Sequence, residues 1–176
     1  MKEAAMTDTQ TIKSEMRAFA QTYDYDMGYL ESLVDTSPGA YDAFAAGMGM
    51  SLYRKALPLD AHFVARVATM QGEDCGPCAQ LTLKMAVEAG VDRDLLALLI
   101  AQPERLPAPL RDVHGHALAV TRETFPDPER AARIRTHYGD EAFAELAVSI
   151  TGSRLYPTLK RALLKSSHCE RLSLDF

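Results

Sequence analysis

The chain has 176 residues, a formal net charge of −5 and a pI near 5.5, which argues against nucleic acid or an anionic membrane surface as a partner because both bind basic faces. No window approaches the roughly 18 consecutive apolar residues of a membrane span, and residues 1–21 lack the apolar core of a signal peptide. Its 3 cysteines are too few for a secreted disulfide scaffold, so we expect a cytoplasmic protein.

Helical patterns follow one another along almost the whole chain, with no clean apolar/polar alternation typical of strands. They predict an all-α fold of about eight helices. The expected ranges are 7–23, 36–57, 58–71, 75–90, 93–102, 107–125, 127–139 and 140–164. We expect one domain over residues 1–176, in which residues 1–24 form an amino-terminal helical arm.

Local signals mark several helix ends. Ser37 is suited to cap a helix that has Pro38 at its first position, and Asp92 is suited to cap the helix that follows it. Gly90 is typical of the residue just after a helix, and Pro157 predicts a kink or break in the last helix. The glycines of "GMGM" at 47–50 indicate a helix break or a close helix contact.

The segment "EDCGPC" at 73–78 holds a Cys-x-x-Cys pair, which suits a zinc site, a structural disulfide or a redox couple. A structural zinc site needs two more ligands, but His114 and His116 point to opposite sides of a helix and "HC" at 168–169 lacks the second spacing. Cys75 and Cys78 lie within bridging range if they occupy the first turn of a helix. A loop this short contributes little stability, so the pair suits a reversible couple better than a staple.

The expected helix turns both cysteines toward the interior or a cleft, and its amino end stabilises the nucleophilic thiolate. Glu73 beside them is either a proton acceptor for a thiol or an acidic residue that complements the helix dipole. "CGPC" is also the motif of thioredoxins, but there it follows a strand, and the segment before Cys75 has a helical pattern.

"VARVATMQGEDCGPC" followed by "AGVDRDLLALLI" resembles the carboxymuconolactone decarboxylase family, and within it the alkylhydroperoxidase D-like branch. The core of the likeness spans 58–101, which would be the redox core, and a looser likeness covers most of the chain. The resemblance implies an all-helical homo-oligomer (a dimer, trimer or hexamer) whose Cys75–Cys78 pair reduces a small hydroperoxide or a partner disulfide. An external thiol reductant or a peroxiredoxin would be its redox partner, and no metal or organic cofactor is required.

The sequence departs from the family pattern at the proton relay. Thr82 stands where the family has a histidine, and Phe63 or Ala61 stands where it has a glutamate. We therefore expect Glu73 first and His62 second to act as acid/base partners of Cys75 and Cys78.

Three other residues are weaker candidates for a role at the site. Asp60 and His114 are further possible acid/base groups, and Cys169 is a possible third thiol. The alternative function is that of a non-redox member of the same fold, such as a decarboxylase-like enzyme or an oligomeric binding protein with passive cysteines.

Overall fold

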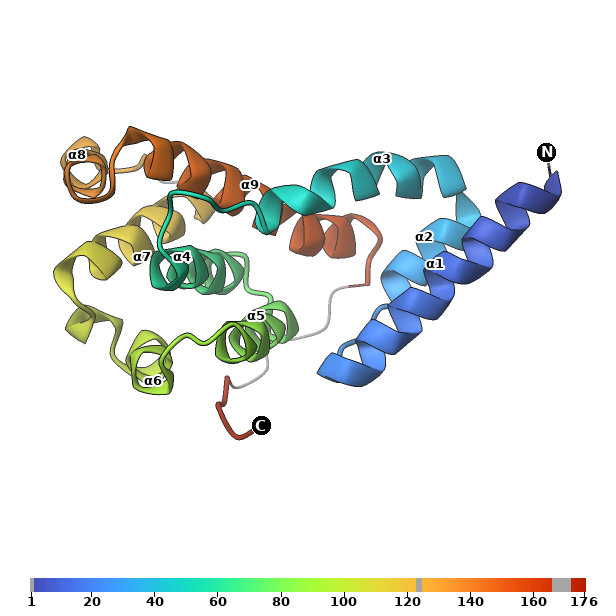
Figure 1. Cartoon of the computed structure of the whole chain (residues 1–176), viewed down its shortest axis with the longest axis horizontal. Helices are drawn as coiled ribbons and strands as arrows, with labels where there is room; N and C mark the ends of the chain where they lie inside the picture. Colours follow the sequence, from blue (N-terminus) through green and yellow to red (C-terminus); the bar gives the residue numbers. More distant parts are fainter. Residues whose placement is uncertain (1, 123–124, 166–171) are drawn as a thin grey trace.

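The computed structural model describes residues 2–122, 125–165 and 172–176 and confirms the all-α expectation (Figure 1). Nine α-helices and two 3-10 turns form the regular structure of these ranges. They are α1 (Lys2–Tyr23), α2 (Gly28–Thr36), α3 (Pro38–Met48), η1 (Gly49–Ser51), α4 (Leu59–Gly72), α5 (Gly76–Glu88), α6 (Arg93–Ala101), η2 (Pro103–Arg105), α7 (Ala108–Thr121), α8 (Pro128–Tyr138) and α9 (Asp140–Ala162). The helix that the sequence analysis missed is α2, a short helix without a side-chain cap.

Most of the predicted helix ends are confirmed. The Ser37 hydroxyl accepts from the Ala40 amide with Pro38 at the start of α3, and the Asp92 carboxylate accepts from the amides of Asp94 and Leu95. Gly90 follows α5 with a φ of 93°, a left-handed conformation that glycine adopts without strain. The expected break at Pro157 does not occur, since α9 continues through this residue.

The predicted break at "GMGM" is confirmed, and a glycine on α9 explains how the segment packs. Helix α3 ends at Met48, and η1 then crosses α9. A Cβ atom on Gly152 of α9 would lie 2.4 Å from the Ser51 backbone nitrogen, so only a glycine permits this approach.

Helix α4 lies at the centre of the larger core, packed against α5, α7 and α9. All ten residues from 61 to 70 are buried, including His62, Arg66 and Thr69. On a helical projection these three fall on the polar side of 58–71, yet all three are buried. Helices α5, α7 and α9 pack around α4, so its polar residues are buried together with the apolar ones.

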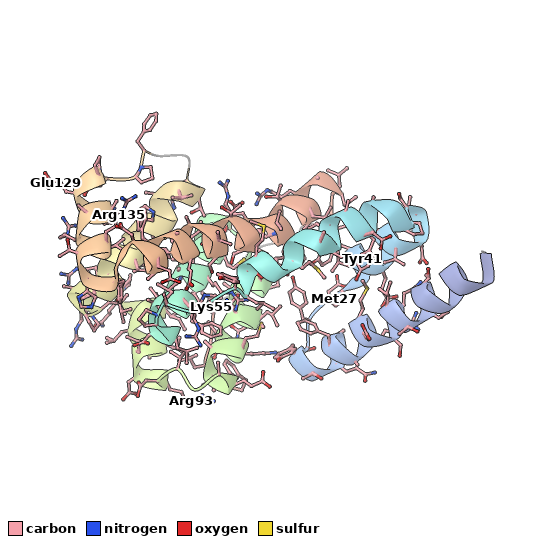
Figure 2. All side chains as sticks on the ribbon, turned by 45° about the horizontal axis from the view of Figure 1, so that its top comes forward. Met27, Tyr41, Lys55, Arg93, Glu129 and Arg135 are labelled. Carbon is pink, nitrogen blue, oxygen red and sulfur yellow. A yellow bond between two sulfur atoms is a disulfide. The ribbon has the colours of Figure 1, made fainter. Side chains whose placement is uncertain are left out.

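A second, smaller core joins α1, α2 and α3. These helices stand beside the α4–α9 bundle, and α3 runs along the carboxyl-terminal half of α9 (Figure 1). Met27 and Tyr41 lie in the space between α1 and α3 (Figure 2). The inner sides of α1 and α2 thereby face α5, the helix that carries the cysteine pair.

Within the residues described, no helix combines the length and apolar character needed to cross a membrane.

Candidate functional site

The two cysteines lie at the amino end of α5 and form a disulfide. Cys75 is the residue before the helix, Pro77 stands in its first turn, and Cys78 follows. The sulfurs are 2.00 Å apart and the Cα atoms 5.2 Å apart, within the bridging range expected from the spacing. Cys75 is partly exposed, whereas Cys78 is only 2% exposed. The two sulfurs therefore differ in access: one meets the surface and the other the interior.

The turn between α4 and α5 presents the pair. The Cys75 amide donates to the carbonyl of Met70, and Asp74 adopts a left-handed φ of 52°, which aspartate tolerates better than most residues. The turn reverses the chain so that α5 packs back along α4.

Glu73, the first predicted acid/base partner, faces α9. Its carboxylate is 3% exposed and forms ion pairs with Arg154 and Arg161, and Arg161 also donates to the Glu73 carbonyl at 3.0 Å. Two arginines thus occupy the carboxylate, and these contacts tie the α4–α5 turn to α9.

His62, the second predicted partner, lies on a different side of α4. Its Nδ1 is 3.4 Å from the Ser149 hydroxyl, and its side chain lines a pocket of about 310 Å³ that does not contain a cysteine. Burial, assisted by the positive charges of Arg66 and Arg54, lowers the pKa of His62 to about 4. His62 and Cys78 thus line different cavities, and the Glu73 carboxylate pairs with arginines of α9. The role of His62 and Glu73 as acid/base partners stays a prediction.

The remaining candidates are also apart from the sulfurs or already engaged. Thr82, at the family's histidine position, lies one turn after Cys78, but its hydroxyl donates to the Cys78 carbonyl at 2.8 Å. His114 is buried on α7, Asp60 is in the first turn of α4, and Cys169 falls outside the described residues. In the described ranges no three His, Cys, Asp or Glu side chains are grouped to hold a metal ion.

The polar group next to Cys78 is a tyrosine from the α1–α3 part of the chain. The hydroxyl of Tyr25, in the turn between α1 and α2, lies 3.6 Å from the Cys78 sulfur. Burial raises the pKa of Tyr25 to about 12, although a hydrogen bond with Tyr29 acts in the opposite direction. Tyr25 therefore keeps its proton at neutral pH, and its hydroxyl can donate to a Cys78 thiolate once the disulfide is reduced.

Two cationic side chains flank this region. The Lys160 ammonium lies 4.4 Å from the ring centre of Tyr25 and 4.9 Å from that of Tyr29. Arg66, on α4, is 5% exposed, and its Nη2 lies 4.0 Å from the Met85 sulfur. Both positive charges favour negative charge near Cys78.

Cys78 lines a partly open cavity of about 270 Å³ between α1–α3 and the α4–α9 bundle. Its lining is largely apolar and comes from α1–α3 on one side and α4 and α5 on the other. The lining includes Tyr25, Tyr29, Arg66, Met85 and Cys78 itself. A small apolar molecule in this cavity would meet the Cys78 sulfur directly.

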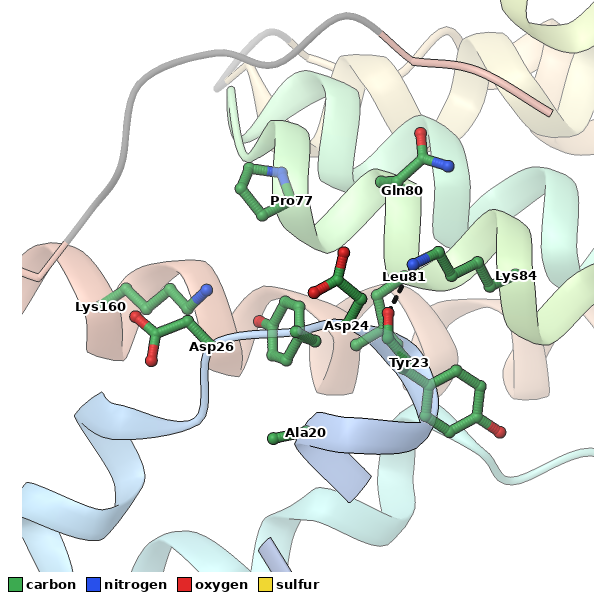
Figure 3. A pocket seen from close by; sticks show the side chains of 10 residues that line it. Ala20, Tyr23, Asp24, Asp26, Pro77, Gln80, Leu81, Lys84 and Lys160 are labelled. Atoms are coloured by element: carbon green, nitrogen blue, oxygen red, sulfur yellow. Dashed lines mark hydrogen bonds between the residues drawn. The ribbon is translucent and has the colours of Figure 1, made fainter. Parts of the chain in front are cut away.

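A second hollow, with a volume of about 550 Å³, lies between the end of α1, the start of α5 and α9 (Figure 3). Its lining includes Asp24, Asp26, Pro77, Lys84 and Lys160. Lys84 donates to the Tyr23 carbonyl across it. The lining of this hollow is largely polar, whereas that of the Cys78 cavity is largely apolar.

The last five residues also contact this region. The Gln80 side chain forms two hydrogen bonds with the Ser173 backbone, at 2.8 and 3.0 Å, and Leu172 packs against the small cluster of Met70, Cys78 and Ala79. Residues 172 and 173 of the carboxyl-terminal segment thus contact the first half of α5.

Tyr25 and Arg66 were missed by the sequence analysis. Tyr25 is one of 7 dispersed tyrosines and lies 53 positions from Cys78, so no local spacing connects the two residues. For Arg66 a signal was present: a charged residue in the middle of the helix that precedes the motif.

No family model matches the sequence, and no curated protein is significantly similar to it. A solved structure with a similar fold is a Cys-to-Ala variant of the debrominase Bmp8 in complex with 2,3,4-tribromopyrrole. The superposition has a TM-score of 0.73 and covers 92% of this chain and 87% of that one, at 15% sequence identity. At this identity the likeness establishes a shared fold.

Proposed function

We propose that the protein is a thiol-dependent oxidoreductase that uses Cys75 and Cys78 to reduce a small hydroperoxide, with reduction of a partner disulfide as the related activity. The observation that carries the proposal is the Cys75–Cys78 bond with one sulfur inside an apolar cavity, beside a protonated tyrosine, and the other near the surface. A resolving thiol is thus already in place beside the sulfur that would meet the substrate.

In the proposed reaction the Cys78 thiolate attacks the terminal oxygen of the hydroperoxide. The O–O bond breaks, the alcohol leaves with a proton, and Cys78 becomes a sulfenic acid. The Tyr25 hydroxyl stabilises the thiolate before the attack and is placed to supply the proton of the leaving alkoxide. Cys75 then attacks the Cys78 sulfur, releasing water and forming the disulfide, so two thiols have reduced one peroxide by two electrons.

An external thiol restores the dithiol by exchange. We assign its attack to Cys75, the more accessible sulfur, with Cys78 as the leaving thiolate. The assignment rests on access: the buried sulfur would meet the small substrate and the outer sulfur would meet the reductant.

A second candidate is reductive removal of a halogen from an aromatic ring, favoured by the fold shared with a debrominase. The Cys78 thiolate would take the bromine, a proton would replace it on the ring, and Cys75 would displace bromide to form the same disulfide. Two thiols are again oxidised, and the carbon–bromine bond is reduced to carbon–hydrogen.

We further propose that the chain is an alkylhydroperoxidase D-like member of the carboxymuconolactone decarboxylase family, that it works in the cytoplasm, and that it forms a homo-oligomer. The all-α fold and the disulfide at a helix start support the first of these. Leu52 and Tyr53, exposed by 57% and 45%, offer apolar surface that supports the last.

The test uses the reduced protein with Cys169→Ser, so that only the pair contributes thiols. Equimolar cumene hydroperoxide should remove both thiols and form the disulfide. Cys78→Ser should abolish the loss, and Cys75→Ser should leave a sulfenic acid that dimedone traps. A parallel sample with tribromopyrrole, assayed for released bromide, tests the second candidate. Equal peroxide consumption by the parent and a Cys75→Ser/Cys78→Ser variant would support the non-redox alternative.

A further inference from the structure

Arg66 is a buried cation whose donors are largely unused. Nε and Nη1 are shielded from water and have no hydrogen-bond partner among the described residues, and Nη2 approaches only the weakly accepting Met85 sulfur, at 4.0 Å. The guanidinium also lies 5.2 Å from the Phe63 ring centre. Burial lowers the pKa of Arg66 to about 10, so the side chain stays charged at neutral pH. No carboxylate balances this charge through an ion pair in the described ranges.

The same side chain lines the cavity that holds the Cys78 sulfur. Among the other lining residues the one carboxylate is Glu15, which is exposed on α1, and the inner wall is apolar or aromatic. A buried arginine without an anionic partner, in an apolar cavity, is costly to the folded protein and suits an anionic ligand.

We infer that Arg66 binds the anionic group of a small apolar organic acid whose reacting end lies at Cys78. The inference rests on the proposed function, since it names the substrate class of the same site. The flexible Met85 side chain, whose sulfur is the present neighbour of Nη2, would move aside for an oxygen acceptor, which forms a far stronger bond with a guanidinium.

The geometry also sets the length of this ligand. Cys78, Thr82 and Met85 follow one another along one side of α5, and all three line the cavity. Seven residues of α-helix separate the first from the last, a rise of about 10 Å. Because Arg66 contacts Met85, about two turns along the helix from Cys78, we expect the anionic group and the reacting group at opposite ends of the ligand, as in a para-substituted benzene ring and unlike an ortho-substituted one.

The volume of about 270 Å³ agrees with this class. It lies at the small end of the range for organic ligands, which suits one ring or a short branched chain. Arg66 also lines the pocket beside His62, so a second place for an anion exists on the other side of the guanidinium. Only an anion in the Cys78 cavity would alter reaction at the sulfur.

The first experiment compares kcat/KM for cumene hydroperoxide and its para-carboxylate. Wild type should prefer the para-carboxylate by about 10- to 100-fold, the contribution of a hydrogen bond to a charged group. The ortho-carboxylate should show no such preference. Arg66→Met should bring the ratio of para-carboxylate to neutral peroxide to about one or below, and Arg66→Lys should recover part of it. The exposed Arg105→Gln is the control and should keep the wild-type ratio.

The second experiment needs no turnover. Para-isopropylbenzoate should bind the oxidised protein more tightly than para-isopropylbenzamide in calorimetry, and Arg66→Met should remove the difference. If neither peroxide oxidises the thiols while the benzoate still binds through Arg66 and slows iodoacetamide alkylation of Cys78 in the reduced protein, the proposed function fails and the inference stands. Binding through Arg66 without that protection would place the anion in the pocket beside His62 and overturn the inference. If wild type shows no preference in either measurement, or Arg66→Met retains the preference, the inference is overturned.

Discussion

Replacing Tyr25 by phenylalanine tests the proposed role of its hydroxyl beside Cys78. The substitution removes one oxygen 3.6 Å from the sulfur and leaves the ring in its buried place against the Lys160 ammonium. A hydrogen bond to a charged group contributes about 1.5–3 kcal/mol, and the long oxygen–sulfur distance favours the lower end. A loss of about 1.5 kcal/mol changes the balance between thiolate and thiol by roughly tenfold.

We therefore expect Tyr25→Phe to react about tenfold more slowly with cumene hydroperoxide at pH 7. The gap should narrow as the pH rises, because hydroxide then ionises the thiol without help from the tyrosine. The assay is a single-turnover loss of thiols from the reduced protein, sampled by rapid quenching between pH 6 and 10. Iodoacetamide alkylation of Cys78, followed by mass spectrometry, reports the same ionisation without a peroxide.

Tyr138→Phe is the matched control. Burial raises the pKa of Tyr138 to about 12 as well. This residue is the last of α8, packs against the larger core and does not line the Cys78 cavity. Its profile should coincide with that of wild type. Coincident profiles for Tyr25→Phe and wild type, in both assays, would refute the reasoning.

Three further predictions concern buried charge. Glu73→Gln should lower the free energy of unfolding by about 1–3 kcal/mol in urea titration. This loss is smaller than for a fully buried ion pair because Arg154 and Arg161 are 33% and 46% exposed. A large loss of activity at unchanged stability would instead favour the acid/base role predicted from the sequence. The depressed pKa of His62 keeps its imidazole neutral in the folded protein, so its contribution to stability is complete above pH 6.5 and is lost toward pH 4, by up to about 3 kcal/mol. His62→Gln should therefore flatten the dependence of Tm on pH between pH 4 and 6.5. An unchanged slope would contradict the assignment of the low pKa to burial. Arg66→Met should leave Tm unchanged or raise it by about 2–8 °C, because it removes two buried donors that have no hydrogen-bond partner. A clear fall of Tm, measured by scanning calorimetry, would mean that the guanidinium stabilises the fold.

Much of the local structure could be predicted from neighbouring residues. Ser37 and Asp92 cap helices as expected because a cap depends on the amides two or three positions away. The Cys-x-x-Cys spacing predicted a bridge at a helix start for the same reason, since the rise and twist of one turn determine the distance between its ends. Pro157 is an exception to the predicted break, since α9 continues through a residue that disfavours the interior of a helix.

The candidate site could be predicted only in part. The pair itself follows from the sequence, but its surroundings come from α1, α2, α4 and α9, which the chain brings together from distant positions. Glu73 was favoured because it adjoins Cys75, yet in the folded chain its carboxylate meets Arg154 and Arg161. Adjacency in sequence says little about the direction of a side chain in a turn.

By itself, then, the sequence determined that the protein is all-helical and that two thiols stand one turn apart at the start of α5. Both properties depend on interactions within a few residues. Only the tertiary structure decided that Cys78 faces an apolar cavity, that Tyr25 is its polar neighbour, and that Arg66 is buried without an acidic partner. These depend on the packing of the α1–α3 lobe against α4 and α5, which no periodicity in the chain encodes.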